Sequence, residues 1–234
     1  MRVALFSDIH GHVTGLKAIF ARLKQLGGAD HIYAVGDILG GGPGTEDVLD
    51  LLLTHDVKML MGNWDEVFCG LDQHLSKIMP KNHESVIRTY EWMIGGLSRP
   101  YQKLIAELPY VRTLQLTPQH KLLLCHATPE STTARVCQWD TPVSDLRKAY
   151  GDLDATIIAY GHYHAHHVRQ LDGKILINVA AVGLGWSGLS ALTLLDTNKD
   201  DLAIRQYQVP YDISEHQRLV QARQMPDNPS IWYW

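Results

Sequence analysis

Cysteine is scarce in this chain, and basic residues are slightly outnumbered. The three cysteines, Cys69, Cys125 and Cys137, are an odd number at no metal-like spacing. This pattern favours a reducing compartment over a disulfide framework. The 21 lysines and arginines face 25 aspartates and glutamates, so no basic surplus is available to neutralise a nucleic-acid backbone. No apolar run approaches the ~20 residues that a transmembrane helix needs.

A secretory signal is also missing from the N-terminal residues. They lead directly into the apolar run Val3–Ser7, which is too short for a signal core and has no cleavage site. We therefore expect a soluble cytoplasmic protein that binds neither a membrane nor a nucleic-acid polymer. A chain of 234 residues suits one domain, residues 1–234, with a large core.

The first sixty residues alternate between short apolar runs and helical spacings. Runs of this kind predict strands, and apolar residues three and four apart predict helices with one buried face. A strand, a helix and a strand of these lengths predict a parallel βαβ crossover. The predicted strands are Val3–Ser7, His31–Val35 and Val57–Met61, and the predicted helices are Thr14–Leu26 and Thr45–His55.

The remaining chain has a helical part and then a part rich in strands. Residues 67–107 carry helical spacings broken by Pro80 and Gly95-Gly96, which predicts a helical insertion that acts as a lid. Later apolar runs, separated by turns such as Asp172-Gly173, predict mainly antiparallel strands. A capping box at Ser214–Gln217 predicts a terminal helix. These strands are predicted at 121–125, 155–160, 174–179, 191–195 and 202–208.

Five predicted strands run into side chains that bind metals. Each residue alone has an ordinary explanation, because Asp37 suits a helix cap, Asn63 a turn and His126 a backbone hydrogen bond. The carboxyl ends of strands in an α/β sheet meet at one edge, where ligands bind. Five such ends with this chemistry are hard to explain as turns, so we predict a metal site. Its residues are Asp8 and His10, Asp37, Asn63, His126, and His162 with His164.

The order of these residues resembles the calcineurin-like metallophosphoesterase family. The motifs are Asp8-x-His10, Gly36-Asp37-x-x-Gly40, Gly62-Asn63-x-Asp65, His126 and Gly161-His162-x-His164. Ser7–Gly11 and the Tyr207–Tyr211 stretch further resemble its small bacterial single-domain branch, which is related to diadenosine tetraphosphatases. The resemblance implies an α/β fold with four layers: a two-sheet β-sandwich of mixed strands flanked by helices, with the site at the strand ends.

The resemblance also implies a dinuclear metal centre and a reaction. Asp8, His10 and His164 would hold one metal, Asn63, His126 and His162 the other, and Asp37 would bridge them. A hydroxide bridging the metals would attack phosphorus in line. Mixed nitrogen and oxygen ligands suit Mn, Fe or Zn better than Mg or Ca. Of these metals we expect Mn first, with Fe or Zn as alternatives.

The chain departs from the family beside Asn63. Much of the family has a histidine at the next position, which protonates the leaving oxygen, whereas this chain has Trp64. An indole cannot serve as a general acid near neutral pH. Asp65 is expected to orient a neighbour. His12 is our first candidate for the missing acid and for a substrate contact, with His166-His167 as alternatives; each is otherwise a solvated loop histidine.

The second departure is in the loop that begins at Asn178. The family has Asn-Pro-Gly-Ser-Val-Gly, and this chain has Asn-Val-Ala-Ala-Val-Gly, so Asn178 is retained as a candidate substrate contact. The aromatic end, Trp232–Trp234, is a candidate contact with a second copy of the chain.

The expected function is hydrolysis of a small nucleotide-like phosphodiester or a pyrophosphate-linked compound. One alternative is a phosphomonoesterase, including a Ser/Thr phosphoprotein phosphatase. The other is a non-catalytic scaffold of the same fold, which would have no physical reason to keep seven ligands.

Overall fold

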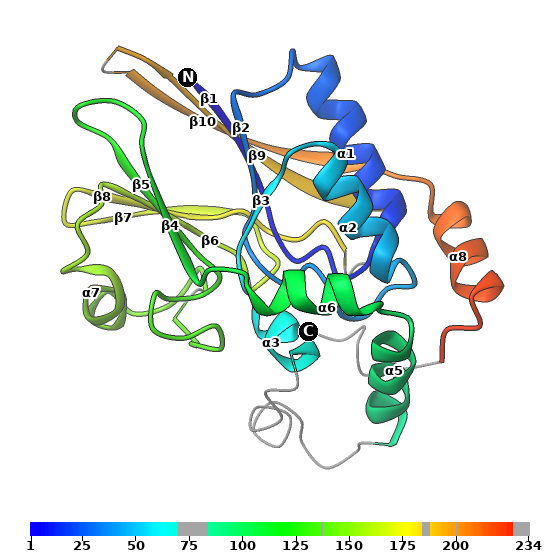
Figure 1. Cartoon of the computed structure of the whole chain (residues 1–234). Helices are drawn as coiled ribbons and strands as arrows, with labels where there is room; N and C mark the ends of the chain where they lie inside the picture. Colours follow the sequence, from blue (N-terminus) through cyan, green and yellow to red (C-terminus); the bar gives the residue numbers. More distant parts are fainter. Residues whose placement is uncertain (70–83, 137, 184–187, 200, 227–234) are drawn as a thin grey trace.

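The computed structural model describes residues 1–69, 84–136, 138–183, 188–199 and 201–226, and its strands form two five-stranded sheets (Figure 1). The first sheet has the order β10-β9-β1-β2-β3. Its strands β1, β2 and β3 are parallel, whereas β9 and β10 run antiparallel to their neighbours. The bounds are β1 Arg2–Phe6, β2 His31–Ala34, β3 Lys58–Met59, β9 Leu189–Asn198 and β10 Asp201–Pro210.

The second sheet has the order β4-β5-β6-β8-β7 and corrects one prediction. Its three central strands are parallel, and only its edge strands are antiparallel. The mainly antiparallel arrangement predicted from the turns was wrong here, because Asp172-Gly173 joins only β7 to β8. The bounds are β4 Val111–Gln115, β5 Lys121–Cys125, β6 Ile157–Tyr160, β7 His167–Leu171 and β8 Lys174–Asn178.

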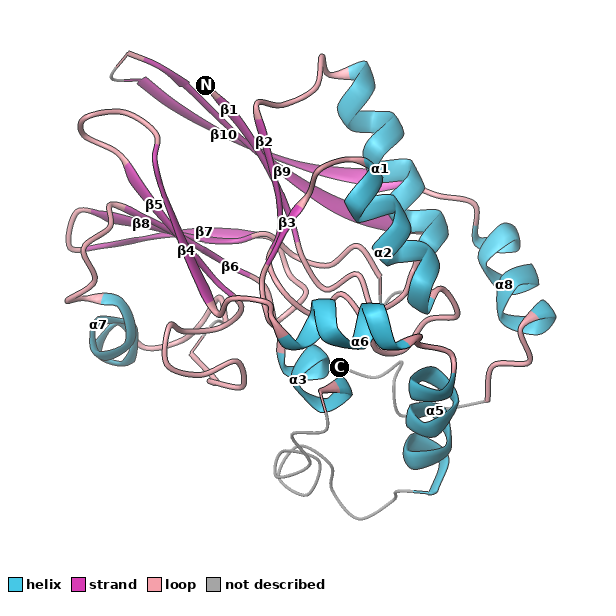
Figure 2. Ribbon diagram, viewed as in Figure 1, coloured by secondary structure: helices cyan, strands magenta, loops and turns pink. Residues whose placement is uncertain are grey.

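Two helices cover the outer face of the first sheet (Figure 2). They are α1 (Val13–Gln25) and α2 (Thr45–Thr54), which confirm the predicted helices to within a residue of each end. The predicted βαβ crossover is therefore confirmed by the parallel pairing of β1 with β2, and β3 pairs in parallel with β2 as well. On the second sheet, α7 (Val143–Tyr150) packs against the face turned away from the first.

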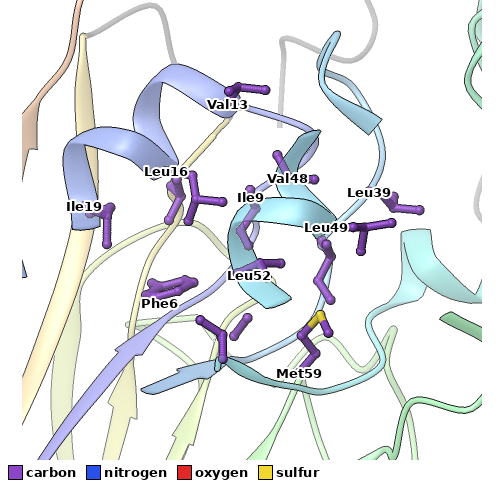
Figure 3. Close-up of a cluster of buried hydrophobic side chains, with 14 of the residues drawn as sticks. Phe6, Ile9, Val13, Leu16, Ile19, Leu39, Val48, Leu49, Leu52 and Met59 are labelled. Atoms are coloured by element: carbon purple, nitrogen blue, oxygen red, sulfur yellow. The ribbon is translucent and has the colours of Figure 1, made fainter. Parts of the chain in front are cut away.

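Side chains alternate along β1 between two separate cores. Ala4 and Phe6 pack toward α1 and α2, together with Leu16 and Leu52 (Figure 3). Val3 and Leu5 point the other way and pack against strands of the second sheet. Burial of one such aliphatic side chain is worth about 1.5–3 kcal/mol. Helices, sheet, sheet and helix therefore form four layers, as the resemblance implied.

The described part of the predicted insertion is helical. It contains the end of α3 (Asn63–Phe68), α5 (Glu84–Gly95) and α6 (Arg99–Ala106). Its role as a lid stays a prediction. The predicted capping box was placed slightly late, because Asp212 is the N-cap of α8 (Ile213–Ala222) and accepts hydrogen bonds from Ser214 and Glu215. Trp232–Trp234 lie outside the described residues.

Candidate metal centre

The loops that follow five strands converge at the carboxyl ends of both sheets. Backbone hydrogen bonds join them: Asp8 N–H donates to the Gly36 carbonyl at 3.0 Å, and His10 N–H donates to the Asp37 carbonyl at 3.0 Å. The second sheet is tied in by the His162 N–H, which donates to Asp8 Oδ2 at 3.1 Å. Strands β1, β2, β3, β5 and β6 thus deliver their polar ends to one place.

Five of the predicted ligands have a left-handed backbone conformation. Their φ angles lie between 50° and 69°, which residues with a Cβ seldom adopt. Such strain costs of order 1–3 kcal/mol per residue and persists where the surroundings impose it, typically at functional sites. The five are Asp8, His10, Asp37, His162 and His164.

Carboxylate and imidazole atoms form two groups with the spacing of metal ligands. One group is Asp8, His10 and His164, and the other is Asp8, Asp37 and His126; within each, the ligand atoms lie within 4.8 Å of one another. Asp8 Oδ1 lies 3.2 Å from His164 Nε2 and 3.8 Å from His10 Nε2. The two groups share Asp8 and are therefore adjacent.

Asp37 and Asn63 extend these groups. Asp37 Oδ1 accepts a hydrogen bond from the Trp64 N–H at 2.8 Å, which directs Oδ2 to lie 3.4 Å from His126 Nε2 and 3.8 Å from His10 Nε2. Asp37 thus faces a histidine of each group. Asn63 Oδ1 lies 3.0 Å from both His126 Nε2 and His162 Nδ1. All seven predicted ligands are brought together, and their role as ligands stays a prediction.

The electrostatics of the site follow from burial and from close opposite charges. Burial opposes ionisation of Asp8, but the neighbouring His164, His126 and His10 outweigh it and hold its pKa well below the usual range. Burial lowers the pKa of both His10 and His162 to about 4. For His126, burial is outweighed by the carboxylates of Asp37 and Asp8, which raise its pKa to about 10.

The residues present fit divalent cations. His10 is buried, and neither of its ring nitrogens has a hydrogen-bond partner among the described residues. An unsatisfied buried polar group costs about 1–3 kcal/mol, and a cation on one nitrogen would offset part of that cost. His126 Nδ1 donates to the Val35 carbonyl at 2.9 Å, which leaves Nε2 as the atom that faces the site. Outer hydrogen bonds of this kind orient histidines that bind metals.

Asp65 lies beneath the site and orders its backbone. The fully buried carboxylate accepts hydrogen bonds from the N–H groups of Ile38, Leu39 and Gly62 at 3.0–3.2 Å. Burial, followed by the charge of Asp37, raises its pKa to about 7. These bonds tie the Asp37 loop to the start of α3, and the catalytic role predicted for Asp65 stays a prediction.

His12, the candidate general acid and substrate contact, has contacts within the protein that do not favour either role, and both roles stay predictions. It is the N-cap of α1, where its Nδ1 accepts a hydrogen bond from the Gly15 N–H at 3.0 Å. Its ring is buried and stacks on His216. Burial and the neighbouring His216 lower its pKa to about 3, so the imidazole is neutral near pH 7 and has no acidic proton to donate. The capping contact and the stack give His12 a structural role.

Asn178 holds two loops together, and its role as a substrate contact stays a prediction. It is fully buried, its Nδ2 donates to the Gly161 carbonyl at 2.8 Å, and its Oδ1 accepts from the Ala180 N–H at 2.9 Å. The side chain thus joins the His162 loop to the next loop. His167, an alternative acid, has its Nε2 3.3 Å from the Tyr160 hydroxyl, and burial lowers the pKa of both His166 and His167.

Three glycines of the predicted motifs pack against the ligands, a role that sequence reasoning did not assign to them. A Cβ on Gly161 would lie 2.4 Å from Asp8 Oδ2, and a Cβ on Gly62 would lie 2.3 Å from Asp37 Oδ1. A Cβ on Gly36 would lie 2.6 Å from His126 Nδ1. Each precedes a predicted ligand, which was the available signal. Trp64 packs against Gly40, with its ring edge-on to His10 at a centroid distance of 6.1 Å.

With this fold and site in view, comparison with known proteins identifies the class. Residues 1–200 match the model of the calcineurin-like phosphoesterase superfamily domain. The chain therefore belongs to the calcineurin-like phosphoesterase superfamily, whose members are metal-dependent phosphoesterases. In the described residues, no helix combines the length and apolarity needed to cross a membrane.

Three further comparisons show which known proteins the chain is similar to. An uncharacterized protein of Methanocaldococcus jannaschii is 23% identical, with 96% of this chain and 94% of that protein covered. A symmetrical bis(5'-nucleosyl)-tetraphosphatase of Enterobacter sp. is 28% identical over 65% of this chain, which spans only 56% of that relative. The crystal structure of a hypothetical protein of Pyrococcus horikoshii shares the fold, with a TM-score of 0.83 at 16% identity and coverage of 99% and 96%.

Proposed function

We propose that this chain hydrolyses phosphoester bonds with the help of two divalent cations. The observation that carries the proposal is the pair of adjacent aspartate and histidine groups that share Asp8. Asp8, His10 and His164 would hold one cation, and Asn63, His126 and His162 the other, with Asp37 between them. Two such cations supply an activated water and neutralise charge on the phosphoryl oxygens.

The ligands themselves favour an anionic substrate. Two carboxylates cannot neutralise two divalent cations, and the other ligands are neutral imidazoles and an amide. The loaded site therefore keeps a net positive charge that attracts a phosphate. We expect Mn to be the metal that supports activity best, with Fe or Zn as alternatives, because the ligand set mixes imidazole nitrogen with carboxylate and amide oxygen.

The proposed substrate is a small nucleotide-like phosphodiester or a pyrophosphate-linked compound. The similarity to a symmetrical bis(5'-nucleosyl)-tetraphosphatase supports the second choice. Trp64 supports it independently, because an indole beside the site has no proton to give to a leaving oxygen. A positioned acid contributes typically ~10²–10⁴-fold, and a phosphate or aryl leaving group needs that help less than an alkoxide does. Alkyl phosphomonoesters should therefore be poor substrates.

The test is a substrate screen with Mn present, using phosphomonoesters, cyclic nucleotides and dinucleoside polyphosphates. It is repeated with Asp37→Asn, which removes the charge between the two groups, and with Asp154→Asn as a matched control on the surface. We expect Asp37→Asn to lose at least ~10²-fold in turnover while the far-UV circular dichroism spectrum is unchanged, and Asp154→Asn to match the unmodified protein.

The same screen separates the alternatives. Preferred turnover of phosphomonoesters or of a phosphorylated protein would indicate a phosphatase instead of a phosphodiesterase. A purified protein that holds no transition metal and shows no activity stimulated by Mn would indicate a scaffold, and the proposed hydrolysis would then be wrong.

A further inference from the structure

Helix α8 and the residue that follows it contact the outer side of two loops that lie next to His10. The helix itself contributes no predicted ligand. The helix packs against α1. Near its start, the His216 ring stacks on His12 with a centroid distance of 3.8 Å and an interplanar angle of 9°. Just past its end, Arg223 donates to the Pro43 carbonyl at 2.9 Å and pairs with Asp47 on α2.

The orientation of the His10 ring depends on its surroundings more than that of the His126 ring does. His126 is held by its own hydrogen bond to the Val35 carbonyl at 2.9 Å. His10 has no such bond on either ring nitrogen within the described part of the chain. Ring contacts with His164 and Trp64 and the course of its backbone must therefore set its orientation.

The first of the two loops is the turn that contains both His10 and His12. The His12 N–H donates to the Ile9 carbonyl at 2.9 Å, and its Nδ1 accepts from the Gly15 N–H. These bonds define the turn that carries His10. The His12 ring lies against Tyr211 as well as His216, so residues of the C-terminal segment cover the outer side of the turn.

The second loop is the glycine-rich stretch at residues 40–44. A Cβ on Gly42 would lie 2.4 Å from the His10 carbonyl oxygen, so this loop presses directly on the backbone of His10. The Gly44 N–H donates to the Gly11 carbonyl at 2.9 Å. Arg223 holds the carbonyl of Pro43, between these two glycines. The turn that carries His10 and the glycine-rich loop that presses on its backbone are thus both contacted from outside by α8 and Arg223.

We propose that His216 and Arg223 are positioning residues for His10, and that metal affinity at Asp8, His10 and His164 therefore depends on the docking of α8. The group around His126 should be insensitive, because its orientation is set by Val35. Ligands held rigidly before the metal arrives lose less freedom on binding. The inference rests on the proposed function in one respect, which is that the site holds two metals.

The experiment is a calorimetric titration of the metal-free full-length protein with Mn²⁺. The variants are His216→Ala, Arg223→Gln and the conservative His216→Phe, which keeps a flat ring on His12. Arg218→Gln is the matched control, because Arg218 lies on α8 and pairs only with Asp212 among the described ion pairs. We expect His216→Ala and Arg223→Gln to weaken one binding step at least tenfold and the other less than threefold. His216→Phe should restore most of the loss.

Two further outcomes decide the inference. Equal weakening of both steps, or variants that match the unmodified protein, would overturn the role of α8 and leave the proposed hydrolysis intact. An unmodified protein that binds no metal would overturn both. Thermal unfolding of the metal-free variants, measured in parallel, identifies any general loss of stability, and Arg223→Gln answers the question if His216→Ala does not fold.

Discussion

At the scale of single residues, the site places histidines whose pKa values are shifted in opposite directions within a few ångströms of one another. Burial keeps His10 neutral, while the nearby Asp37 and Asp8 keep a proton on His126 until a cation arrives. Metal uptake therefore has to displace that proton. Trp64 belongs to the same environment. Its large apolar ring lies against His10, at a place where a proton donor would otherwise fit.

The substitution Trp64→His tests the missing acid. An imidazole at this position can donate a proton, so we expect the ratio of kcat/KM for alkyl to aryl phosphoesters to rise by ~10-fold or more. Trp64→Phe removes the indole without adding a proton donor and is the control. If both variants change the ratio equally, the change follows from the shape of the side chain at position 64. Protonation of the leaving oxygen would then not explain it.

Protonation of His12 should make the fold sensitive to acid. Its folded pKa of about 3 lies below the ordinary 6.5, so the unfolded chain binds more protons between these values. The contribution of His12 to stability is complete above pH 6.5 and is lost as the pH falls toward 3, which amounts to about 2 kcal/mol by pH 5. His12→Asn keeps an N-cap but does not titrate. Urea unfolding at pH 7 and pH 5 should show a smaller loss in this variant, and an equal loss would contradict the prediction.

At the scale of elements, three of the strand ends need a glycine, Gly36, Gly62 and Gly161, where loops pass closely. Gly161 is the clearest case, because a Cβ there would meet Ser7 Oγ at 2.1 Å as well as Asp8 Oδ2. Ser7 is itself fixed, since its hydroxyl donates to the Val35 carbonyl at 2.7 Å. The junction between β1 and β6 therefore has no room for a methyl group.

We expect Gly161→Ala to lower both stability and metal affinity. An added methyl group at a site that cannot relax typically costs 1–3 kcal/mol. Here it would displace the carboxylate of Asp8, which both ligand groups share. Gly95→Ala is the matched control, because a Cβ at this helical position meets nothing within 4 Å. Thermal melting and Mn²⁺ titration would measure both effects. A Gly161→Ala protein that binds metal normally would show that the loops can separate without cost.

At the scale of the whole molecule, we expect the fold to form without metal. Three apolar cores of the described residues lie between and outside the sheets. Burial of these side chains supplies the main driving force for folding. The centre is thus placed at the edge of a scaffold that holds its ligands before any cation binds.

Removal of metal should therefore lower stability without unfolding the chain. Binding to the folded state alone adds about 2.7 kcal/mol when free metal is at a hundred times its dissociation constant. Treatment with a chelator should reduce the Tm by several degrees and leave the far-UV circular dichroism spectrum unchanged. An unfolded protein after chelation, or an unaltered Tm, would contradict this expectation.

The sequence by itself determined the family, the central strands and the residues that gather at their ends. Local signals suffice for these, because a fully buried strand such as β6 is a continuous apolar run and each predicted ligand lies in the segment that follows a strand. The edge strands β4 and β7 were missed, since half-buried strands at a sheet edge carry a weaker apolar pattern. The parallel pairing of β5, β6 and β8 depends on crossovers that turn residues do not reveal.

Only the tertiary structure decided the contacts of His12 and Asn178. Both were predicted as site residues from their place in the chain, and their partners come from distant segments: His216 on α8 for one and the Gly161 loop for the other. The protonation of a histidine or the contacts of an amide depend on neighbours that the chain assembles in space. A sequence can place a side chain at the end of a strand, whereas its burial and its partners follow from how the elements pack.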